Sequence, residues 1–285
     1  MGGWAGIALA LRGSDADAMR SRLPTYLHPL AGRVLAWHVL RTVADLRPRP
    51  QRLWLAAVEP LDPSITGELP AEVVDVGEAA EVDRGPLSER IAELGGETLL
   101  LVDAAAAVLS GSLARLVAGP AGRAVRDAEE RPLAVWLEAG EALERGGAAG
   151  FTLEALAEGL PEPSRGGASE QDRFAVRDRA SFARASRLIR DRIVERLMAE
   201  GVTILLPETV LVDVDVTVEP DTVIYPGVVL EGQTTIGSET VIGPGCRIID
   251  SRIGSGVELK GWNYIVGTSI RNRAVLEPYV RRGHD

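Results

Sequence analysis

The chain has 285 residues, of which 46% are hydrophobic and 25% are charged, which is enough for two domains with their own cores. Its net charge of −10 argues against a nucleic-acid-binding protein. The apolar stretches are far shorter than the roughly 20 residues that a bilayer span needs, and the run at residues 4–11 has no basic flank typical of a signal peptide. The single cysteine, Cys246, fits a reducing compartment, so we expect a cytoplasmic protein with neither nucleic acid nor membrane as a partner.

Apolar runs alternate with helical patterns in the first part of the chain. The runs cover residues 4–11, 30–46, 53–58, 86–94, 98–102, 112–117 and 133–137. Such alternation is typical of a parallel sheet with crossover helices, and it predicts a Rossmann-like α/β domain over residues 1–173. Residues 118–172 are rich in Ala, Gly, Glu and Arg and poorly patterned, so we expect part of this segment to be loop.

Residues 174–201 predict a connector helix. Phe182, Ile189, Ile193 and Leu197 recur at helical spacing, charged residues occupy the other faces, and Gly201 is placed to end the helix. We interpret the charged faces as solvated, with ion pairs between residues four positions apart that stabilise the helix.

Residues 202–285 repeat with a period of six. Aliphatic residues recur at Leu206, Val212, Val218, Ile224, Leu230, Ile236, Ile242 and Ile248, and again at Ile253, Leu259 and Ile265. A small or β-branched residue, or Cys246, lies two positions before each of the first eight. Neither a helix nor an ordinary strand has this period, which predicts a parallel β-helix of hexapeptide repeats with these residues, Cys246 included, in its core.

The order of these three parts resembles that of the bacterial bifunctional N-acetylglucosamine-1-phosphate uridyltransferase and glucosamine-1-phosphate acetyltransferase family. Residues 23–39, LPTYLHPLAGRVLAWHV, are similar to the family's L-P-K-x-L-x-x-L-A-G segment, and residues 192–245 are similar to its helix and first repeats. The resemblance implies a nucleotidyltransferase-like first domain, a left-handed β-helix, a nucleotide and magnesium site after the first strand, and an acetyl-transfer site on later coils. We expect a degenerate relative that is truncated at its C-terminal end.

The segment that matches the family's phosphate-binding loop has lost most of its pattern. Leu11, Arg12 and Gly13 remain as a remnant of a nucleotide site, but the later glycine and arginine are absent. Asp15 and Asp17 stand where the resemblance places phosphate, and like charges at contact distance repel strongly in a cleft. We therefore expect no family-type phosphate binding.

The resemblance also identifies the positions that would carry charge and metal. Thr25 replaces the lysine of the L-P-K segment, and Ala104 and Arg177 fall on the two magnesium positions. A hydroxyl supplies no positive charge, and an arginine repels magnesium, which requires oxygen ligands. Asp103 lies one residue from the expected position and is retained as a remnant nucleotide-site residue.

The sequence also lacks a well-placed histidine for the acetyl-transfer site that the resemblance implies. His284 is the only histidine in residues 202–285, and it lies at a terminus that we expect to be frayed. His28 and His38 lie in the first domain, where we interpret them as packing or helix-surface residues.

We therefore predict a scaffold, oligomerisation or regulatory protein with no catalytic residues, no metal ligands and no cofactor. One alternative is an active sugar-1-phosphate nucleotidyltransferase that uses magnesium with displaced groups such as Asp103 and Arg12. Another is an acyltransferase completed by a second chain. A nucleotide or a sugar is the small-molecule ligand that we expect if any binding survives.

We also predict a homotrimer that assembles through the β-helix. The resemblance implies three-fold assembly. Val214, Val223, Val229 and Val241 lie off the inward register, so some of these apolar side chains should face outward. Symmetric closure buries such surface without forming fibres, although valine also suits an exposed strand.

Overall fold

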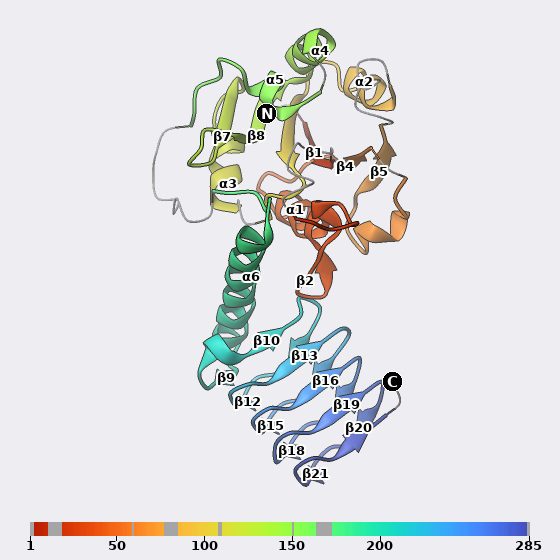
Figure 1. The fold of residues 1–285 in the computed structure, drawn as a ribbon, viewed down its shortest axis with the longest axis vertical. Helices are drawn as coiled ribbons and strands as arrows, with labels where there is room; N and C mark the ends of the chain where they lie inside the picture. The colour runs from red at the N-terminus through yellow and green to blue at the C-terminus, as the bar shows by residue number, and fades with distance from the viewer. Residues whose placement is uncertain are drawn as a thin grey trace. The chain divides into compact units, whose positions relative to one another are not determined.

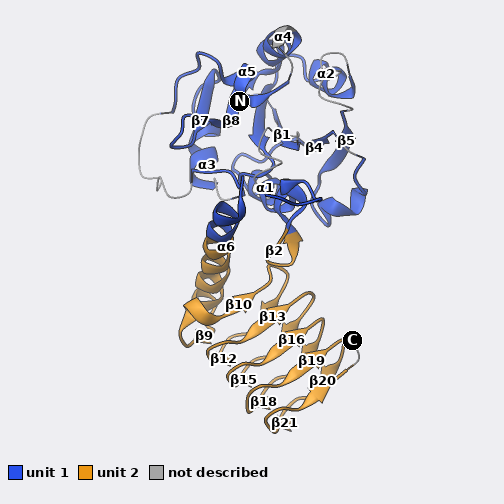
Figure 2. Ribbon diagram, in the orientation of Figure 1, with its two compact units in different colours: residues 1–28, 34–185 blue, residues 29–33, 186–285 orange. Residues whose placement is uncertain are grey.

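The computed structural model describes residues 3–10, 19–58, 60–76, 85–107, 110–149, 151–163 and 173–283. The chain divides into two compact units, shown in different colours in Figure 2. The first comprises residues 1–28 and 34–185, and the second comprises residues 29–33 and 186–285.

A six-stranded sheet with the order β5-β4-β1-β6-β8-β7 forms the centre of the first unit (Figure 1). Four neighbouring strands are parallel, namely β5 (Glu72–Asp75), β4 (Arg52–Ala57), β1 (Trp4–Ala10) and β6 (Thr98–Asp103). The other two, β8 (Pro132–Glu138) and β7 (Arg123–Arg126), join antiparallel at one edge. All seven residues of β1 are buried, as expected for a central parallel strand covered on both faces.

Short helices accompany this sheet. In the described ranges they are α1 (Leu35–Ala44), α2 (Pro86–Ala92), α3 (Ser110–Ala118), α4 (Ala139–Ala149) and α5 (Leu153–Ala157). The 3₁₀ turns η2 (Thr25–Leu27) and η3 (Pro63–Thr66) lie in the connections. One apolar cluster contains Ile7 and Leu101 from the sheet, Ile91 from α2 and Leu156 from α5, all fully buried. The predicted Rossmann-like α/β class is confirmed.

Much of the segment that the sequence leaves unpatterned is regular structure. Strands β7 and β8 and helices α4 and α5 lie within residues 118–172. Strand β7 has only two buried residues, Ala124 and Val125, so it makes no apolar run in the sequence. Arg126 ties it to the following segment, because its guanidinium donates hydrogen bonds to the carbonyls of Leu160 and Ala157 at 3.1 and 2.8 Å.

Helix α6 (Arg179–Ala199) begins later than the predicted start at residue 174. The Asp178 carboxylate accepts a hydrogen bond from the Ser181 backbone N–H at 2.7 Å, which is the arrangement of a helix N-cap. The residues before the cap are bonded to the segment after β6 and are not helical, since the Val176 N–H donates to the Ala105 carbonyl at 2.9 Å.

The second unit contains a β-helix of three parallel sheets. One is made of β9 (Thr203–Ile204), β12 (Val223–Ile224), β15 (Val241–Ile242), β18 (Glu258–Leu259) and β21 (Val275–Leu276). The next is made of β10 (Leu211–Val212), β13 (Val229–Glu231), β16 (Arg247–Ile249), β19 (Tyr264–Val266) and β22 (Arg281–Arg282). The third is made of β11 (Thr217–Val218), β14 (Thr235–Ile236), β17 (Arg252–Ile253) and β20 (Ser269–Ile270). The predicted left-handed hexapeptide β-helix class is confirmed.

The six-residue register is right at every predicted aliphatic position except the first. Residues from Val212 to Ile265 in this register are buried, and so is Cys246, whose thiol pKa is raised by burial. Leu206 is 57% exposed, and Ile204 takes the inward place beside Ile224 instead. The cause is the first corner, where residues 205–210 include the 3₁₀ turn η6 (Pro207–Thr209). This corner is longer than those of the later coils, which have two to four residues.

A segment from early in the chain belongs to the β-helix unit. Residues 29–33 comprise β2 (Pro29–Leu30), the turn after it and the first residue of β3 (Arg33–Val34), and they contact the first coil. The Val214 N–H donates to the Ala31 carbonyl at 3.1 Å, and the Arg33 guanidinium donates to Asp215 at 2.6 Å. Three consecutive residues, 31 to 33, therefore meet three consecutive residues, 213 to 215.

Asp213 lies at the centre of this contact. Burial raises the pKa of its carboxyl, and the nearby carboxylates of Glu231, Asp215 and Asp250 raise it further, whereas the Gly232 N–H that it accepts at 2.9 Å acts in the opposite direction. A Cβ atom on Gly32, whose φ is +81°, would lie 2.8 Å from the Asp213 Cγ. Only glycine fits here without strain.

We predict that Gly32→Ala destabilises the protein by about 2 kcal/mol, because it adds a clash to a left-handed backbone. Urea-induced unfolding of the full chain measures this loss. Gly96→Ala is the matched control, since Gly96 lacks a left-handed φ and has open space around it. Equal stability of the two variants would contradict a close contact between residues 29–33 and the first coil.

Candidate functional site

The carboxyl ends of β1 and β6 mark the place where an open α/β sheet binds ligands. Strand β1 lies between β4 and β6, so the chain passes from β1 to one side and later returns to the other. A crevice at such a reversal, outside the carboxyl ends of the strands, is the usual ligand site of this architecture. The Ala104 N–H donates to the Leu9 carbonyl at 3.0 Å, which joins the two strand ends.

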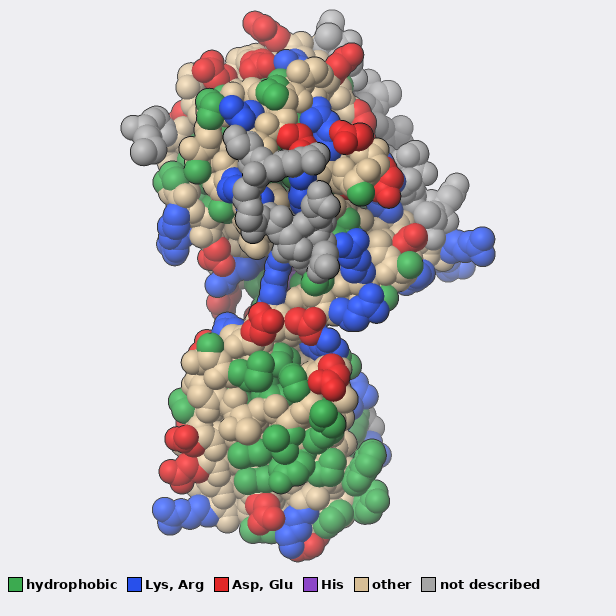
Figure 3. All heavy atoms as spheres, turned by 90° about the vertical axis from the view of Figure 1, so that its left-hand side faces the viewer, with side chains coloured by type: hydrophobic (Ala, Val, Ile, Leu, Met, Phe, Trp, Pro, Cys, Tyr) green, Lys and Arg blue, Asp and Glu red, His purple; other side chains and the backbone are tan. Residues whose placement is uncertain are grey.

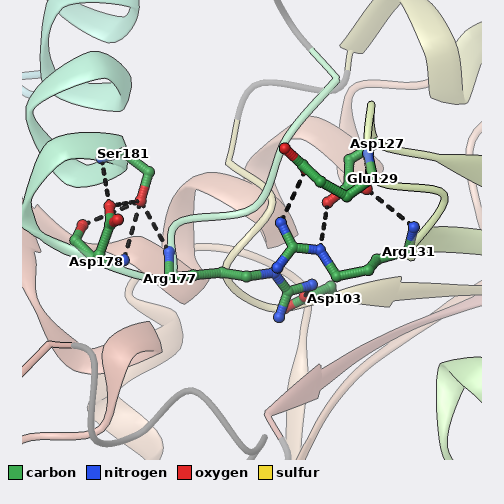
Figure 4. A network of polar contacts seen from close by, with 7 residues as sticks. All are labelled: Asp103, Asp127, Glu129, Arg131, Arg177, Asp178 and Ser181. Carbon is green, nitrogen blue, oxygen red and sulfur yellow. Dashed lines mark hydrogen bonds and ion pairs between the residues drawn. The ribbon is translucent and has the colours of Figure 1, made fainter.

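Asp103 is the last residue of β6 and places a carboxylate at the carboxyl end of this strand. One of its carboxylate oxygens accepts a hydrogen bond from the Ala105 N–H at 2.8 Å. The other lies 3.3 Å from an Nη of Arg177, an ion pair of two side chains that are each 20% exposed (Figure 4). The carboxylate therefore has a backbone donor on one side and a guanidinium on the other.

The turn before α6 holds Arg177 in place. Its backbone N–H donates to the Ser181 hydroxyl at 3.0 Å, and the same hydroxyl bonds Asp178. The preceding residue, Val176, is tied to the Ala105 carbonyl, so the segment runs beside the end of β6. The N-cap of α6 and the edge of the sheet thus position the guanidinium together.

This ion pair changes what the edge can bind. A guanidinium donates directed hydrogen bonds to carboxylate oxygens and repels a cation. The paired Asp103 carboxylate is therefore a poor ligand for magnesium. Ala104, the other position that the resemblance assigned to the metal, is buried and has no ligating side-chain atom. Across the described ranges of the chain, no group of three or more His, Cys, Asp or Glu side chains could hold a metal ion.

Several residues of the predicted site lie outside the described residues. They are Leu11, Arg12, Gly13, Asp15, Asp17 and His284. Thr25 is described and lies in the 3₁₀ turn η2, where its hydroxyl brings no charge. Of the four remnant nucleotide-site residues, the structure therefore places Asp103 alone.

The segment that resembles the family's L-P-K-x-L-x-x-L-A-G pattern is only partly buried. Tyr26 and Leu30 are buried, whereas Leu23 is 50% exposed and Pro29 and Gly32 are exposed as well. His28 is buried with its ring 5.9 Å from that of Phe182. Burial lowers the pKa of the His28 imidazole, and the nearby Arg179 charge lowers it further.

His38 is likewise buried, within α1 and beside Trp37. The packing interpretation of both histidines is right.

A second polar cluster was not predicted from the sequence. In the hairpin between β7 and β8, the buried Asp127 carboxylate accepts hydrogen bonds from the backbone N–H groups of Glu129 and Arg131 at 3.0 and 2.9 Å. It also accepts from the Arg131 guanidinium at 2.9 Å, and a second nitrogen of that guanidinium reaches the Glu129 carboxylate (Figure 4). With its acceptors engaged by the turn, Asp127 stabilises the hairpin and is not a catalytic candidate.

Comparison with known proteins gives the affiliation of the chain. Residues 215–250 match the family described as bacterial transferase hexapeptide (six repeats). The Bifunctional protein GlmU of Streptomyces avermitilis is 26% identical over 316 residues, covering 88% of this chain and 64% of that protein. The chain is related to the GlmU proteins.

Two further GlmU proteins give the range of the similarity. That of Paraburkholderia phytofirmans is 27% identical over 318 residues, which cover 92% of this chain and 69% of the relative. That of Acetivibrio thermocellus is 42% identical, but over 112 residues, 39% of this chain and 24% of the relative. The chain thus spans about a quarter to two thirds of the length of these GlmU proteins.

Among solved structures, a 4-diphosphocytidyl-2C-methyl-D-erythritol synthase covers 66% of this chain at 13% identity, with a TM-score of 0.47. Within the part of the chain that the structure describes, no helix combines the length and the apolar character needed to cross a bilayer.

We predict that Asp103 and Arg177 are energetically coupled. Asp103→Asn and Arg177→Gln should each lower the free energy of unfolding, and the double variant should lose about 1 kcal/mol less than the sum, because the second change no longer breaks the ion pair. Chemical denaturation of the four proteins gives the cycle. Additive losses would show that the two side chains do not interact in solution.

Proposed function

We propose that this GlmU relative is a catalytically inactive scaffold. The observation that carries the proposal is the Arg177–Asp103 ion pair at the carboxyl end of β6, where a guanidinium engages the carboxylate that a metal-dependent mechanism would need. Transfer of a phosphoryl-linked group requires positive charge aimed at the reacting phosphates. Here the charge of Arg177 is directed at a carboxylate of the protein itself.

The other residues of the edge support the same conclusion. Thr25 and Ala104 carry no charge, and the chain has no lysine before Lys260. Lys260 lies in the β-helix unit, where its ammonium is 2.6 Å from the Glu277 carboxylate. For acetyl transfer, the thiol of Cys246 is buried in the core with a raised pKa and is unsuited to act as a nucleophile.

The second candidate function is an active nucleotidyltransferase that makes a UDP-sugar with displaced groups. Asp103 favours it, because this carboxylate lies at the ligand-binding edge of the sheet and one residue from the position implied by the resemblance. In that mechanism Asp103 would exchange Arg177 for magnesium when nucleotide binds, and Arg12 would contact the phosphates. The two functions differ in one measurable property, magnesium-dependent turnover.

We predict that the purified chain releases no pyrophosphate from UTP and N-acetylglucosamine-1-phosphate in the presence of magnesium, while an active GlmU protein assayed beside it does. Nucleotide binding measured by calorimetry in the same buffer shows whether affinity survives without turnover. Release above background that disappears in Asp103→Ala would overturn the proposal and establish the second function.

We further propose that the scaffold is a homotrimer assembled through the β-helix. The outward side chains of the sheet β9-β12-β15-β18-β21 include Val223, Val241 and Val275, and we call these three residues the valine face. The first two are half-buried and the third is exposed. Figure 3 shows hydrophobic side chains gathered on one side of this unit. Rotational closure is a common way to bury such a patch.

We predict that the double variant Val223→Lys, Val241→Lys lowers the molar mass in light scattering from that of a trimer to that of a monomer, because charges cannot be buried between apolar faces. The matched control is Thr217→Lys, Thr235→Lys, which places two lysines on the outward side of the sheet β11-β14-β17-β20. A monomeric wild-type chain at micromolar concentration, or dissociation of the control alone, would contradict assembly through the valine face.

Cytoplasmic location is part of the same proposal. It is supported by the cysteine content, since Cys246 is the single cysteine and is buried without a disulfide. A nucleotide or sugar remains the small-molecule ligand to test. The proposed scaffold role requires no metal or other cofactor, whereas the second candidate function requires magnesium.

A further inference from the structure

One corner of the β-helix carries two bulky side chains where the backbone favours glycine. Gly227, Gly245, Trp262 and Tyr279 occupy the same corner position in four successive coils, two residues before β13, β16, β19 and β22. Their φ angles are +74°, +66°, +54° and +65°. A left-handed backbone is strained for a bulky residue, and such strain persists where the side chain has a use.

These two aromatic side chains are outward and exposed. Trp262 is 59% exposed and Tyr279 is 77% exposed. A Cβ atom on Gly245 would lie 2.5 Å from the Trp262 ring, so the indole rests directly on the coil before it and has a defined position. Packing of the Trp262 ring on the preceding coil before any partner binds lowers the entropy cost of ordering it on association.

Arginine accompanies these aromatic residues on the neighbouring sheet. The Tyr264 ring has the guanidinium of Arg247 5.9 Å and that of Arg281 5.3 Å from its centroid. Trp, Tyr and Arg are the residue types that contribute most of the binding energy in protein interfaces. The last two coils thus present the composition of a protein-binding surface.

The first coil presents a different surface on the same side of the β-helix. Leu211 is exposed, and its ladder of paired positions runs through Val229, Arg247 and Tyr264 to Arg281. Leu205 and Leu206, in the corner before Leu211, are exposed as well. We call the six residues at the two ends of this side the corner strip. They are Leu205, Leu206, Leu211, Trp262, Tyr279 and Arg281.

Charge changes sign along the β-helix. Residues 203–250 contain one arginine and eight acidic residues, whereas residues 251–285 contain six basic and three acidic residues. Glu208 lies exposed beside the leucines of the corner strip, and Arg281 lies beside its aromatic residues. Glu208 therefore gives the leucine end an exposed carboxylate, and Arg281 gives the aromatic end an exposed guanidinium.

We propose that the corner strip binds the corner strip of a second copy turned end for end. A two-fold pairing of this kind places Trp262 and Tyr279 of each copy on the leucines of the other, and Arg281 of each copy near Glu208 of the other. The strip is then complementary to itself, as a two-fold interface requires. A side-by-side pairing in the same direction would set acidic coils against acidic coils, and an unrelated acidic partner would match only half of the strip.

This interface is distinct from the valine face and does not depend on whether the chain is an enzyme. It adds a two-fold contact to whatever assembly the valine face makes. Because the contact pairs opposite charges near the surface, it weakens at high salt.

Sedimentation velocity of the full chain at micromolar concentration tests the proposal. At low salt we expect twice the mass found at high salt. Arg281→Glu should halve the mass at low salt, and the double variant Glu208→Arg, Arg281→Glu should restore it, because the exchanged charges face each other again. Trp262→Gly should also halve the mass without lowering the melting temperature, since the same corner already accepts Gly227 and Gly245.

The matched control is Arg196→Glu, a charge reversal at an exposed residue of α6. This variant should still show twice the mass at low salt. Val223→Lys, Val241→Lys should still double in mass at low salt, which separates this contact from the proposed trimer. A wild-type mass independent of salt would overturn the proposal. A double variant Glu208→Arg, Arg281→Glu that stays as dissociated as Arg281→Glu would overturn the end-for-end arrangement.

Discussion

The stacking of coils at a six-residue period is the constraint on which the second unit depends. Each coil donates backbone hydrogen bonds to the next, as when the Val223 N–H reaches the Thr240 carbonyl and the Val241 N–H reaches the Val257 carbonyl, both at 2.8 Å. The inward positions keep the six-residue period from Val212 to Ile248, and the later coils are one residue shorter because the corner between β16 and β17 has two residues. Buried hydroxyls fit the same scheme, since Thr222 and Thr240 donate to carbonyls of the following coil at 3.1 and 2.9 Å.

The α/β unit is held by a different kind of constraint, which leaves its chemistry free to vary. Its parallel strands need continuous apolar runs, and the fully buried residues of β1 and β6 provide them. The polar residues at the carboxyl edge contribute little to that core. A site at this edge can therefore exchange a ligand for an internal ion pair, such as Arg177 with Asp103, while the sheet beneath it is unchanged. Retention of a fold then says little about retention of its reaction.

How far the sequence predicts the structure depends on how local each signal is. The β-helix core could be predicted because no other structure has its period, and Leu206 was misplaced only because one corner is longer than the rest. The late start of α6 has a local cause, the Asp178 cap, which the helical pattern of the following residues obscured. The ion pair of Asp103 with Arg177 joins residues 74 positions apart. No pattern in either segment predicts that it contacts the other. The contacts of Asp127 are local, with residues 129 and 131. They were not predicted because a short acidic turn ordinarily indicates a solvated loop.

The segment from Ala31 to Arg33 has a structural role that does not depend on any chemistry at Thr25. Ala31 accepts the Val214 N–H, Gly32 lies against Asp213, and Arg33 pairs with Asp215. Each contact satisfies a polar group or fills space at the first coil, where a β-helix has no preceding coil to do so. A substitution at Thr25 leaves these contacts intact, whereas a side chain at residue 32 disturbs them directly. The two parts of this short segment are therefore under different constraints. A charged residue at position 25 would act on a ligand, whereas residues 31–33 close the first coil of the β-helix.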